Sequence, residues 1–379
     1  MNSLNLNLVD STKRTATMKS GRATRYGVMA AAACCAFAEN ANSEQLYGLL
    51  RVRDLTPFGF LRLDMRPAYA VSIEPGNWAL ETEIGYQNTW ALSPLVEQYL
   101  ISLEPQGRRE LGPAEVQAIR DLPGENYLVD TELATLDVTF HYKFSPRVTG
   151  YLIASGVAYR GGFLDSTIEG FHDTFGFGTF GRLAAARNDV NLIYDLKSSQ
   201  SVYLESPTSG GVTDPTLGVR FIGIAMPKNW QLALEAAVKI PIDGERLLLS
   251  TGRTDYGVQA SLQHLGEHHG WYVSASAVYY AGADDPVPQD SRVIPTLVVG
   301  YELALTDNFN INLQGYASPS VYTHDQTDLK ELLEDKYQLS LGLRYRASHV
   351  LITFGITENL QNVNNTPDIG AQLGFAYLP

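Results

Sequence analysis

Hydrophobic and polar residues alternate along most of the chain after residue 78. Between residues 230 and 242, seven apolar residues fall on one face of an extended chain: Trp230, Leu232, Leu234, Ala236, Val238, Ile240 and Ile242. A period of two is the period of a β-strand, whereas a helix would scatter these residues around its axis. The pattern therefore predicts a strand with one apolar face and one polar face.

The same alternation recurs in twelve segments. They are residues 78–90, 131–144, 148–160, 214–226, 229–242, 255–265, 271–281, 293–305, 308–318, 336–346, 348–358 and 367–378. Each is about ten to fourteen residues long, the length that a tilted strand needs to cross a bilayer. We predict an all-β fold, a transmembrane antiparallel β-barrel of about twelve strands over residues 78–379. The alternative is a soluble β-sandwich, which does not require such regularly long strands.

The predicted connections are alternately short and long. Outer-membrane barrels have short periplasmic turns and long extracellular loops, so this alternation fits that class. The count works only if residues 190–206 form a hairpin inside the second long loop. Residues 113–120 in the first long loop begin with proline and predict a short helix.

Aromatic residues lie near the predicted strand ends. They are Trp78, Trp90, Trp230, Trp271, Tyr256, Tyr337 and Tyr377. Aromatic girdles occupy the two membrane interfaces because the ring is apolar while its N–H or O–H group needs water.

The polar faces of the strands would line the barrel lumen. The candidate lumen residues are Glu81, Glu83, Asp137, His141, Lys143, Arg220, Glu235, Lys239, Glu302, Arg344 and Arg346. Both charge signs are present, so the lumen could be sealed by salt bridges or filled with water. A twelve-stranded barrel lies between barrels filled by side chains and open porins, so strand number leaves both options.

The N-terminal residues have the pattern of a secretory signal. A basic stretch with Lys19, Arg22 and Arg25 precedes a short apolar run, and Ala36-Phe37-Ala38 fits a cleavage site. We predict that residues 1–38 contain a signal peptide and that translation truly starts at Met18. A buried hydrophobic helix and a lipoprotein signal at Cys34 are the alternatives. The chain would then be exported to the cell outer membrane of a Gram-negative bacterium.

Charge limits the partners of the exported part. Without its first 38 residues the chain has 23 basic and 40 acidic residues, a balance of −17. Nucleic-acid binding depends on Lys and Arg, so this balance argues against it. We expect outer-membrane lipids, lipopolysaccharide, the barrel-assembly machinery and a small solute as partners. We expect neither a cofactor nor a metal site.

Two further segments are candidates for function. Residues 39–77 precede the first strand and form either a periplasmic lead-in or a lumen plug, and the apolar residues between Phe58 and Met65 favour the plug. The second long loop holds candidates for a constriction or binding patch at the barrel mouth: Phe171, His172, Asp173, Phe175, Phe177, Phe180 and Arg182. A self-packed loop is the alternative reading of the same residues.

Three stretches carry a resemblance to a known family. They are Leu55-Thr56-Pro57-Phe58, Phe171-His172-Asp173-Thr174-Phe175-Gly176 and Asp214-Pro215-Thr216-Leu217-Gly218-Val219-Arg220-Phe221. These stretches resemble an uncharacterised family of predicted proteobacterial outer-membrane proteins, known as a domain of unknown function. The resemblance implies a β-barrel, and it implies no activity, substrate or catalytic residue.

The sequence therefore leaves three functions open. The first is a narrow channel or uptake protein for small polar or amphipathic solutes. The second is an outer-membrane enzyme acting on lipid, for which Ser166 and His172 are the only nucleophile and base that the sequence suggests. The third is a sealed structural or adhesive barrel. We favour the channel and expect no catalytic residues.

Overall fold

The computed structural model describes residues 46–53, 59–66, 73–198, 202–204, 209–284, 287–361 and 369–377. The expected signal peptide, residues 1–38, lies outside the described residues. So do parts of the predicted lead-in, including the Leu55-Thr56-Pro57-Phe58 stretch. Residues 40–379 form one compact unit, and the following description concerns that unit.

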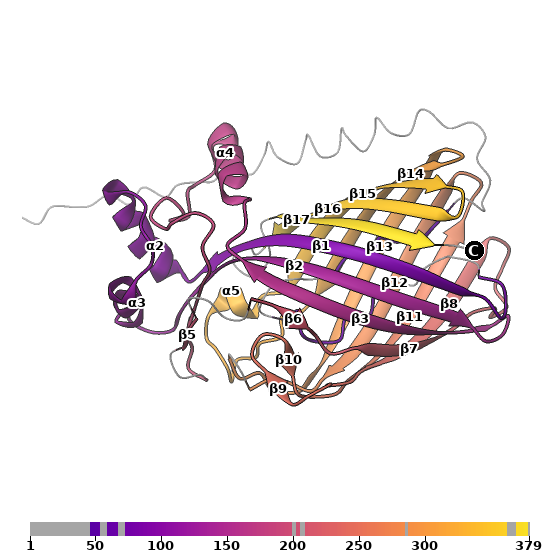
Figure 1. Cartoon of the computed structure of the whole chain (residues 1–379), viewed down its shortest axis with the longest axis horizontal. Coiled ribbons are helices and arrows are strands. Elements are labelled where there is room, and N and C mark those ends of the chain that lie inside the picture. The colour runs from indigo at the N-terminus through magenta and orange to yellow at the C-terminus, as the bar shows by residue number, and fades with distance from the viewer. Residues whose placement is uncertain are drawn as a thin grey trace, which may run out of the picture. The chain divides into compact units, whose positions relative to one another are not determined.

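Twelve antiparallel strands form the wall of a closed barrel (Figure 1). They are β1 (Trp78–Leu92), β2 (Asn126–Lys143), β3 (Val148–Arg160), β7 (Thr216–Phe221), β8 (Trp230–Lys239), β11 (Asp255–Leu265), β12 (His269–Tyr280), β13 (Arg292–Thr306), β14 (Phe309–Ser318), β15 (Lys336–Ala347), β16 (Val350–Gln361) and β17 (Ile369–Tyr377). Each strand pairs with the next wall strand in sequence. The last strand, β17, pairs with β1 from Leu80 opposite Tyr377 to Asn88 opposite Ile369. The predicted twelve-stranded barrel is confirmed.

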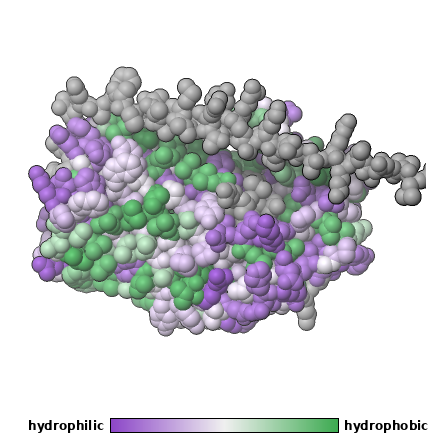
Figure 2. Space-filling model, turned by 180° about the vertical axis from the view of Figure 1, so that it is seen from behind, coloured by the Kyte–Doolittle hydropathy of each residue, from purple (hydrophilic) through white to green (hydrophobic). Residues whose placement is uncertain are grey.

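Apolar and polar residues alternate in the sequence because successive side chains of a strand point to the outside and the inside of the barrel wall in turn. In β15, Lys336, Gln338 and Arg344 are at most 2% exposed, whereas Leu341 between them is 53% exposed. The other strands repeat this arrangement, and Figure 2 shows apolar side chains across the wall between more polar ends of the barrel. The exposed apolar belt suits contact with the hydrocarbon of a membrane. A closed barrel can lie there because its backbone polar groups are paired between neighbouring strands.

The predicted aromatic residues lie at both ends of the belt, with one exception. Trp78 is exposed and lies against Phe140 and Tyr377, with ring centroids 6.2 and 5.6 Å away. Trp90 is buried instead, and its indole N–H donates to the carbonyl of Phe180 at 2.9 Å. The long loops cover this end of β1, so the assignment of Trp90 to a girdle was wrong.

All the described helices lie at the long-loop end of the barrel (Figure 1). The additional elements are α2 (Pro94–Leu103), η3 (Glu104–Gln106), α3 (Pro113–Arg120), α4 (Asp165–Phe175), β4 (Asn191–Asp195), β5 (Val202–Leu204), β6 (Gly211–Val212), β9 (Glu245–Arg246), β10 (Ser250–Thr251) and α5 (Lys330–Leu333). The predicted hairpin is confirmed, because β4 and β5 pair. The predicted helix over residues 113–120 is also confirmed.

Three wall strands differ in length from their predictions by four residues or more: β2 is longer, whereas β7 and β8 are shorter. Strand β2 begins at Asn126 rather than residue 131, because residues 126–130 continue beyond the wall and pair with β4. Strand β7 ends at Phe221, and Gly223 then adopts a positive φ of 80° that an extended strand does not allow. Among the described residues, no helix is long and apolar enough to cross a membrane.

Candidate functional site

A chain segment before β1 lies against the inner face of the wall. We call residues 46–53 and 59–66 the inner segment. Leu46 packs with Ala304 near the short-turn end of β13, whereas Phe60 packs with Val321 in a long loop at the opposite end. Farther along, Ile73 packs with residues next to the short turns again. The contacts of the segment therefore extend from one end of the barrel to the other.

The strongest anchor of the inner segment is Glu302 on β13, a fully buried carboxylate. It accepts hydrogen bonds from the backbone N–H groups of Tyr47 and Gly48 at 3.0 and 2.9 Å. It also accepts from the Tyr272 hydroxyl at 2.8 Å and lies 3.3 Å from a guanidinium nitrogen of Arg344. Arg344 in turn donates to the carbonyls of Gly48 and Leu49. One ion pair of the wall, Glu302 with Arg344, therefore holds the segment through the backbone N–H groups and the backbone carbonyl groups of the segment.

A second anchor joins arginines of the inner segment to acids of β1 and β2. Arg66 donates to Asp137 at 2.7 Å, and a guanidinium nitrogen of Arg53 lies 3.6 Å from the same carboxylate. A nitrogen of Arg51 lies 3.0 Å from an oxygen of Glu81. Buried carboxylates are stable as ions only when such partners compensate for lost hydration. The acids of the wall are matched by cations that the segment supplies.

A third anchor lies on β8 and β11. The Lys239 ammonium donates to the carbonyl of Leu61 at 2.8 Å and lies 3.0 Å from Asp255. Asp255 also contacts the segment itself, because it accepts from the N–H of Leu63 at 2.8 Å. Here too, wall charges hold backbone groups that a sheet or helix would otherwise pair.

Three glycines of the wall make room for side chains of the inner segment. A Cβ atom on Gly342 would lie 2.5 Å from a methyl carbon of Leu50, and one on Gly257 would lie 2.6 Å from the Met65 sulfur. A Cβ atom on Gly300 would overlap a methyl group of Leu49. Close packing of this kind fixes the position of the segment on β11, β13 and β15.

The structure places the sequence-predicted lumen residues on the inner side of the wall. Besides those above, Arg220 pairs with Glu235, and His141 Nε2 lies 3.2 Å from Glu81. Glu83 lies 3.9 Å from Arg66, a long ion pair, and Lys143 is buried. Arg346 differs from these residues, because it is half-buried beside a short turn and donates to the carbonyl of Ser348.

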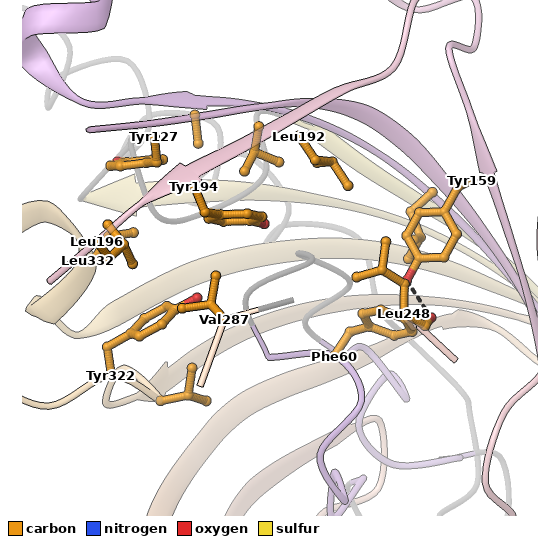
Figure 3. Packing of buried hydrophobic residues seen from close by; sticks show 14 of the residues in the cluster. Phe60, Tyr127, Tyr159, Leu192, Tyr194, Leu196, Leu248, Val287, Tyr322 and Leu332 are labelled. Carbon is orange, nitrogen blue, oxygen red and sulfur yellow. Dashed lines mark hydrogen bonds between the residues drawn. The ribbon is translucent and has the colours of Figure 1, made fainter. Parts of the chain in front are cut away.

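The outer end of the lumen is covered by a cluster of apolar and tyrosine side chains, shown in Figure 3. We call it the outer cluster, and it contains Phe60, Ala91, Tyr127, Val129, Leu133, Val157, Tyr159, Leu192, Tyr194, Leu196, Leu248, Tyr280, Val287, Ile294, Val321, Tyr322 and Leu332. Its members come from wall strands, from several long loops and, through Phe60, from the inner segment. The Tyr159 hydroxyl donates to the carbonyl of Leu248 at 2.8 Å, which ties β3 to a neighbouring loop.

The residues predicted at the mouth lie elsewhere. Phe171, Phe175 and Phe177 are 52–64% exposed, on α4 or just after it, and their rings pack on one another. His172 and Asp173 lie on the same helix, and the His172 ring nitrogen Nδ1 lies 3.2 Å from the Gly178 carbonyl. Phe171, Phe175 and Phe177 therefore match the alternative of a self-packed loop and do not form a constriction inside the mouth. Tyrosines and leucines of other loops occupy that place.

Phe180 and Arg182 have structural contacts instead. Phe180 packs beside α2 and α3, and Arg182 is buried. The Arg182 guanidinium lies 3.3 Å from Asp165 and donates to the Asn88 side chain at 3.2 Å. These contacts fix α4 to the end of β1.

A second ion-pair group holds α4 from its exposed side. Arg108 and Arg187 donate to Glu169 at 2.6 and 2.5 Å. Burial raises the pKa of the Glu169 carboxyl, but the hydrogen bonds from the two arginines outweigh burial and leave this pKa below its ordinary value of 4.5. The carboxylate form of Glu169 therefore stabilises the position of the helix.

Sequence reasoning missed the partners in the inner segment. Arg51, Arg53, Arg62 and Arg66 all lie in this short segment, and that density of arginine was the available signal. Within the described part of the chain, no group of three or more metal-ligating side chains could hold a metal ion.

Three small cavities, lined by both polar and apolar groups, lie beside the inner segment among the described residues. Each of them has room for only about one or two water molecules. None of these three cavities, as lined by the described residues, admits a larger solute.

Comparisons with known proteins place the chain in context. The model of a family described as "Protein of unknown function (DUF3187)" matches residues 122–378. No curated protein matches the chain.

Solved structures with similar folds include the COG4313 outer membrane channel from Pseudomonas putida F1. It is 12% identical with a TM-score of 0.48, covering 83% of this chain and 99% of that one. The P. putida toluene transporter TodX is 10% identical with a TM-score of 0.40, covering 81% and 91%. The NanC porin is 7% identical with a TM-score of 0.39, covering 65% and 94%.

Proposed function

Because this chain belongs to the DUF3187 family of proteins of unknown function, we propose its function from its geometry: an outer-membrane channel for small polar solutes, closed by a removable plug. The exposed apolar belt with aromatic residues at both ends supports the membrane location. The expected signal peptide at residues 1–38 would supply export, and the long loops would then face the outside.

One observation carries the proposal. The lumen is filled by a separate chain segment, the inner segment, and not only by side chains of the wall. The segment is held by ion pairs and hydrogen bonds, such as Arg66 to Asp137 and Glu302 to Gly48. Water can replace these partners when the segment leaves, whereas the apolar packing of Leu49, Leu50 and Met65 against the wall opposes its release. Without the segment, the interior would be a charged, hydrated pore.

A sealed structural barrel is the second candidate. The narrowness of the three cavities favours it, because they hold little more than water. The two candidates differ in whether the inner segment ever leaves the lumen.

The lipid-acting enzyme loses its only suggested residues. Ser166 and His172 are six positions apart on α4. At about 1.5 Å of rise per residue they are separated by about 9 Å along the helix axis and point in different directions. A base and nucleophile must come within hydrogen-bond reach, so these two do not form a catalytic pair.

Planar-bilayer recordings in KCl test the proposal. Deletion of residues 46–66 from the full chain should give frequent openings of much larger conductance than the parent protein. A matched control replaces the exposed Phe171, Phe175 and Phe177 with serine, and it should conduct like the parent. Silence of the deletion variant, with a barrel that still shifts in a heat-modifiability gel, would favour the sealed structural barrel.

A further inference from the structure

The inner segment packs closely against the wall on one side of the lumen. On another side, Tyr47 packs with Ala376 near the end of β17, but the segment does not reach Gly370 and Gly374 of the same strand. The packed side is formed by β11, β13 and β15, where Gly257, Gly300 and Gly342 receive its side chains. On β17, a Cβ atom at Gly370 would have Gln87 and Thr357 as its nearest neighbours, at 3.3 Å or more. At Gly374 the nearest neighbours would be Thr353 and Thr82, at 3.4 Å or more. These neighbours belong to the wall and not to the inner segment.

The first and third cavities lie on this second side and adjoin one another. The first cavity is lined by Gly370 and Thr357, and the third by Gly374 and Thr353. Both also have Glu83 and Gln372 in their lining, so these two residues form the junction between them. Small residues of β16 and β17 thus face two adjoining spaces.

A further junction continues the series. Arg53 lines both the first cavity and the second, and the second reaches Asp214 and Leu249 among the long loops. The third cavity includes Ala376, whose backbone is near the short-turn end of β17. The three spaces therefore follow one another from near the short turns to the long loops.

We propose that these three cavities are the path by which small ions and water cross the lumen while the inner segment is in place. Glu83 on β1 and Arg53 on the inner segment are the narrow points of the path. The inference rests on the proposed channel function and specifies where the solute passes. It also names Glu83 as a selectivity residue, because a charge at a narrow junction in a water-poor lumen acts strongly on passing ions.

The charge at Glu83 is less compensated than that of its neighbours. Glu81 has Arg51 at 3.0 Å and His141 at 3.2 Å, whereas the nearest cation to Glu83 is Arg66 at 3.9 Å. A cation in the path would therefore find an acceptor at Glu83. We expect the parent protein to prefer potassium over chloride.

Glutamine substitutions on β17 test the path. Gly370→Gln and Gly374→Gln each place a neutral polar side chain into a cavity, and each should reduce the small KCl conductance of the parent several-fold. The matched control is Gly342→Ala on the packed side. Its added methyl group would push against Leu50, so conductance should rise as the inner segment loosens.

Glu83→Gln tests selectivity. In a potassium chloride gradient the reversal potential should move toward that of chloride, with a several-fold lower ratio of potassium to chloride permeability. The deletion of residues 46–66 serves as the reference for an open pore, and a heat-modifiability gel verifies that each variant forms a barrel.

The outcomes separate the path from the channel. If the deletion variant conducts but the parent is silent, or the β17 variants conduct like the parent, the path is wrong and the channel remains. An unchanged permeability ratio in Glu83→Gln overturns the selectivity role of Glu83. If neither the parent nor the deletion variant conducts, both the path and the proposed function are wrong.

Discussion

Replacing Glu302 with glutamine should release the inner segment while leaving the barrel wall intact. The substitution preserves size but removes the negative charge that receives the N–H groups of Tyr47 and Gly48. It also leaves the buried Arg344 without its carboxylate partner on the wall. The amide has one acceptor oxygen in place of two, so some donors around it lose their bonds.

The size of the effect follows from the bonds that change. A hydrogen bond to a charged group contributes about 1.5–3 kcal/mol and a neutral one about 1 kcal/mol, so weakening the two backbone bonds costs about 2 kcal/mol. At about 1.4 kcal/mol per factor of ten, the released population of the inner segment should rise about 30-fold. The lost ion pair between Glu302 and Arg344 adds to this value, so it is a lower bound.

Cysteine labelling measures that population. The reporter is Val52→Cys in a background with Cys34 and Cys35 replaced by alanine, because Val52 is only 6% exposed. When opening and closing are fast compared with the reaction, the maleimide labelling rate follows the open population. The rate in Glu302→Gln should therefore exceed that of the reporter alone by about 30-fold or more.

Glu235→Gln is the matched control. Glu235 is a buried carboxylate on β8 whose hydrogen-bond and ion-pair partners, Arg220 and Gln259, both belong to the wall. Its loss should destabilise the wall with little change in labelling at position 52. Equal labelling rates for Glu302→Gln and the reporter alone, in a folded barrel, would refute Glu302 as the anchor.

Three further substitutions or conditions test the long-loop end. Gly162→Ala should displace the start of α4 and expose residues 161–189 to limited proteolysis, because φ is +79° and the new methyl group would overlap Glu132, a strain of about 1–3 kcal/mol. Acidification should loosen α4 in the same assay. Because the pKa of Glu169 is lowered, its ionised carboxylate stabilises the position of α4 fully at pH values above 4.5, and this stabilisation is lost as the pH falls through the lowered pKa. Phe60→Ala should cost about 3–5 kcal/mol by leaving a cavity in the outer cluster, seen as a lower unfolding temperature.

The wall could be predicted from the sequence because one physical constraint repeats in every strand. Leu339 and Leu341 face outward, while Gln338 and Ser340 face inward, and this holds wherever the strand lies in the barrel. The period of two can be recognised in each strand without knowing which residues of other strands or segments it contacts. Turn lengths then gave the two ends of the barrel.

The contents of the lumen could not be predicted in the same way. The pairing of Arg51 with Glu81, or the packing of Leu49 against Gly300, joins particular residues that are far apart in sequence. No period marks such contacts. The candidate lumen residues were found because they share the inward face, but their partners were not.

The mouth residues were misplaced for a different reason. Burial of apolar residues is a tendency and not a rule, since folded proteins also expose much apolar surface. Phe171 and Phe175 lie on one exposed face of α4, and a ring on a helix can pack on its neighbour one turn away. Trp90 shows the converse, an aromatic residue at a strand end that the loops bury.

Phe60 connects the two closures of the lumen. It belongs to the inner segment, yet its ring lies in the outer cluster with an edge-on contact to Tyr159 at a centroid distance of 6.0 Å. Its carbonyl accepts from Arg53 at 2.7 Å, at the junction of two cavities. When the inner segment leaves the lumen, the outer cluster loses the Phe60 ring. When the loops open, Phe60 is no longer held by the outer cluster, and Arg53 loses the fixed position of the Phe60 carbonyl to which it donates. Because neither closure is complete without Phe60, the two should open together rather than as independent gates.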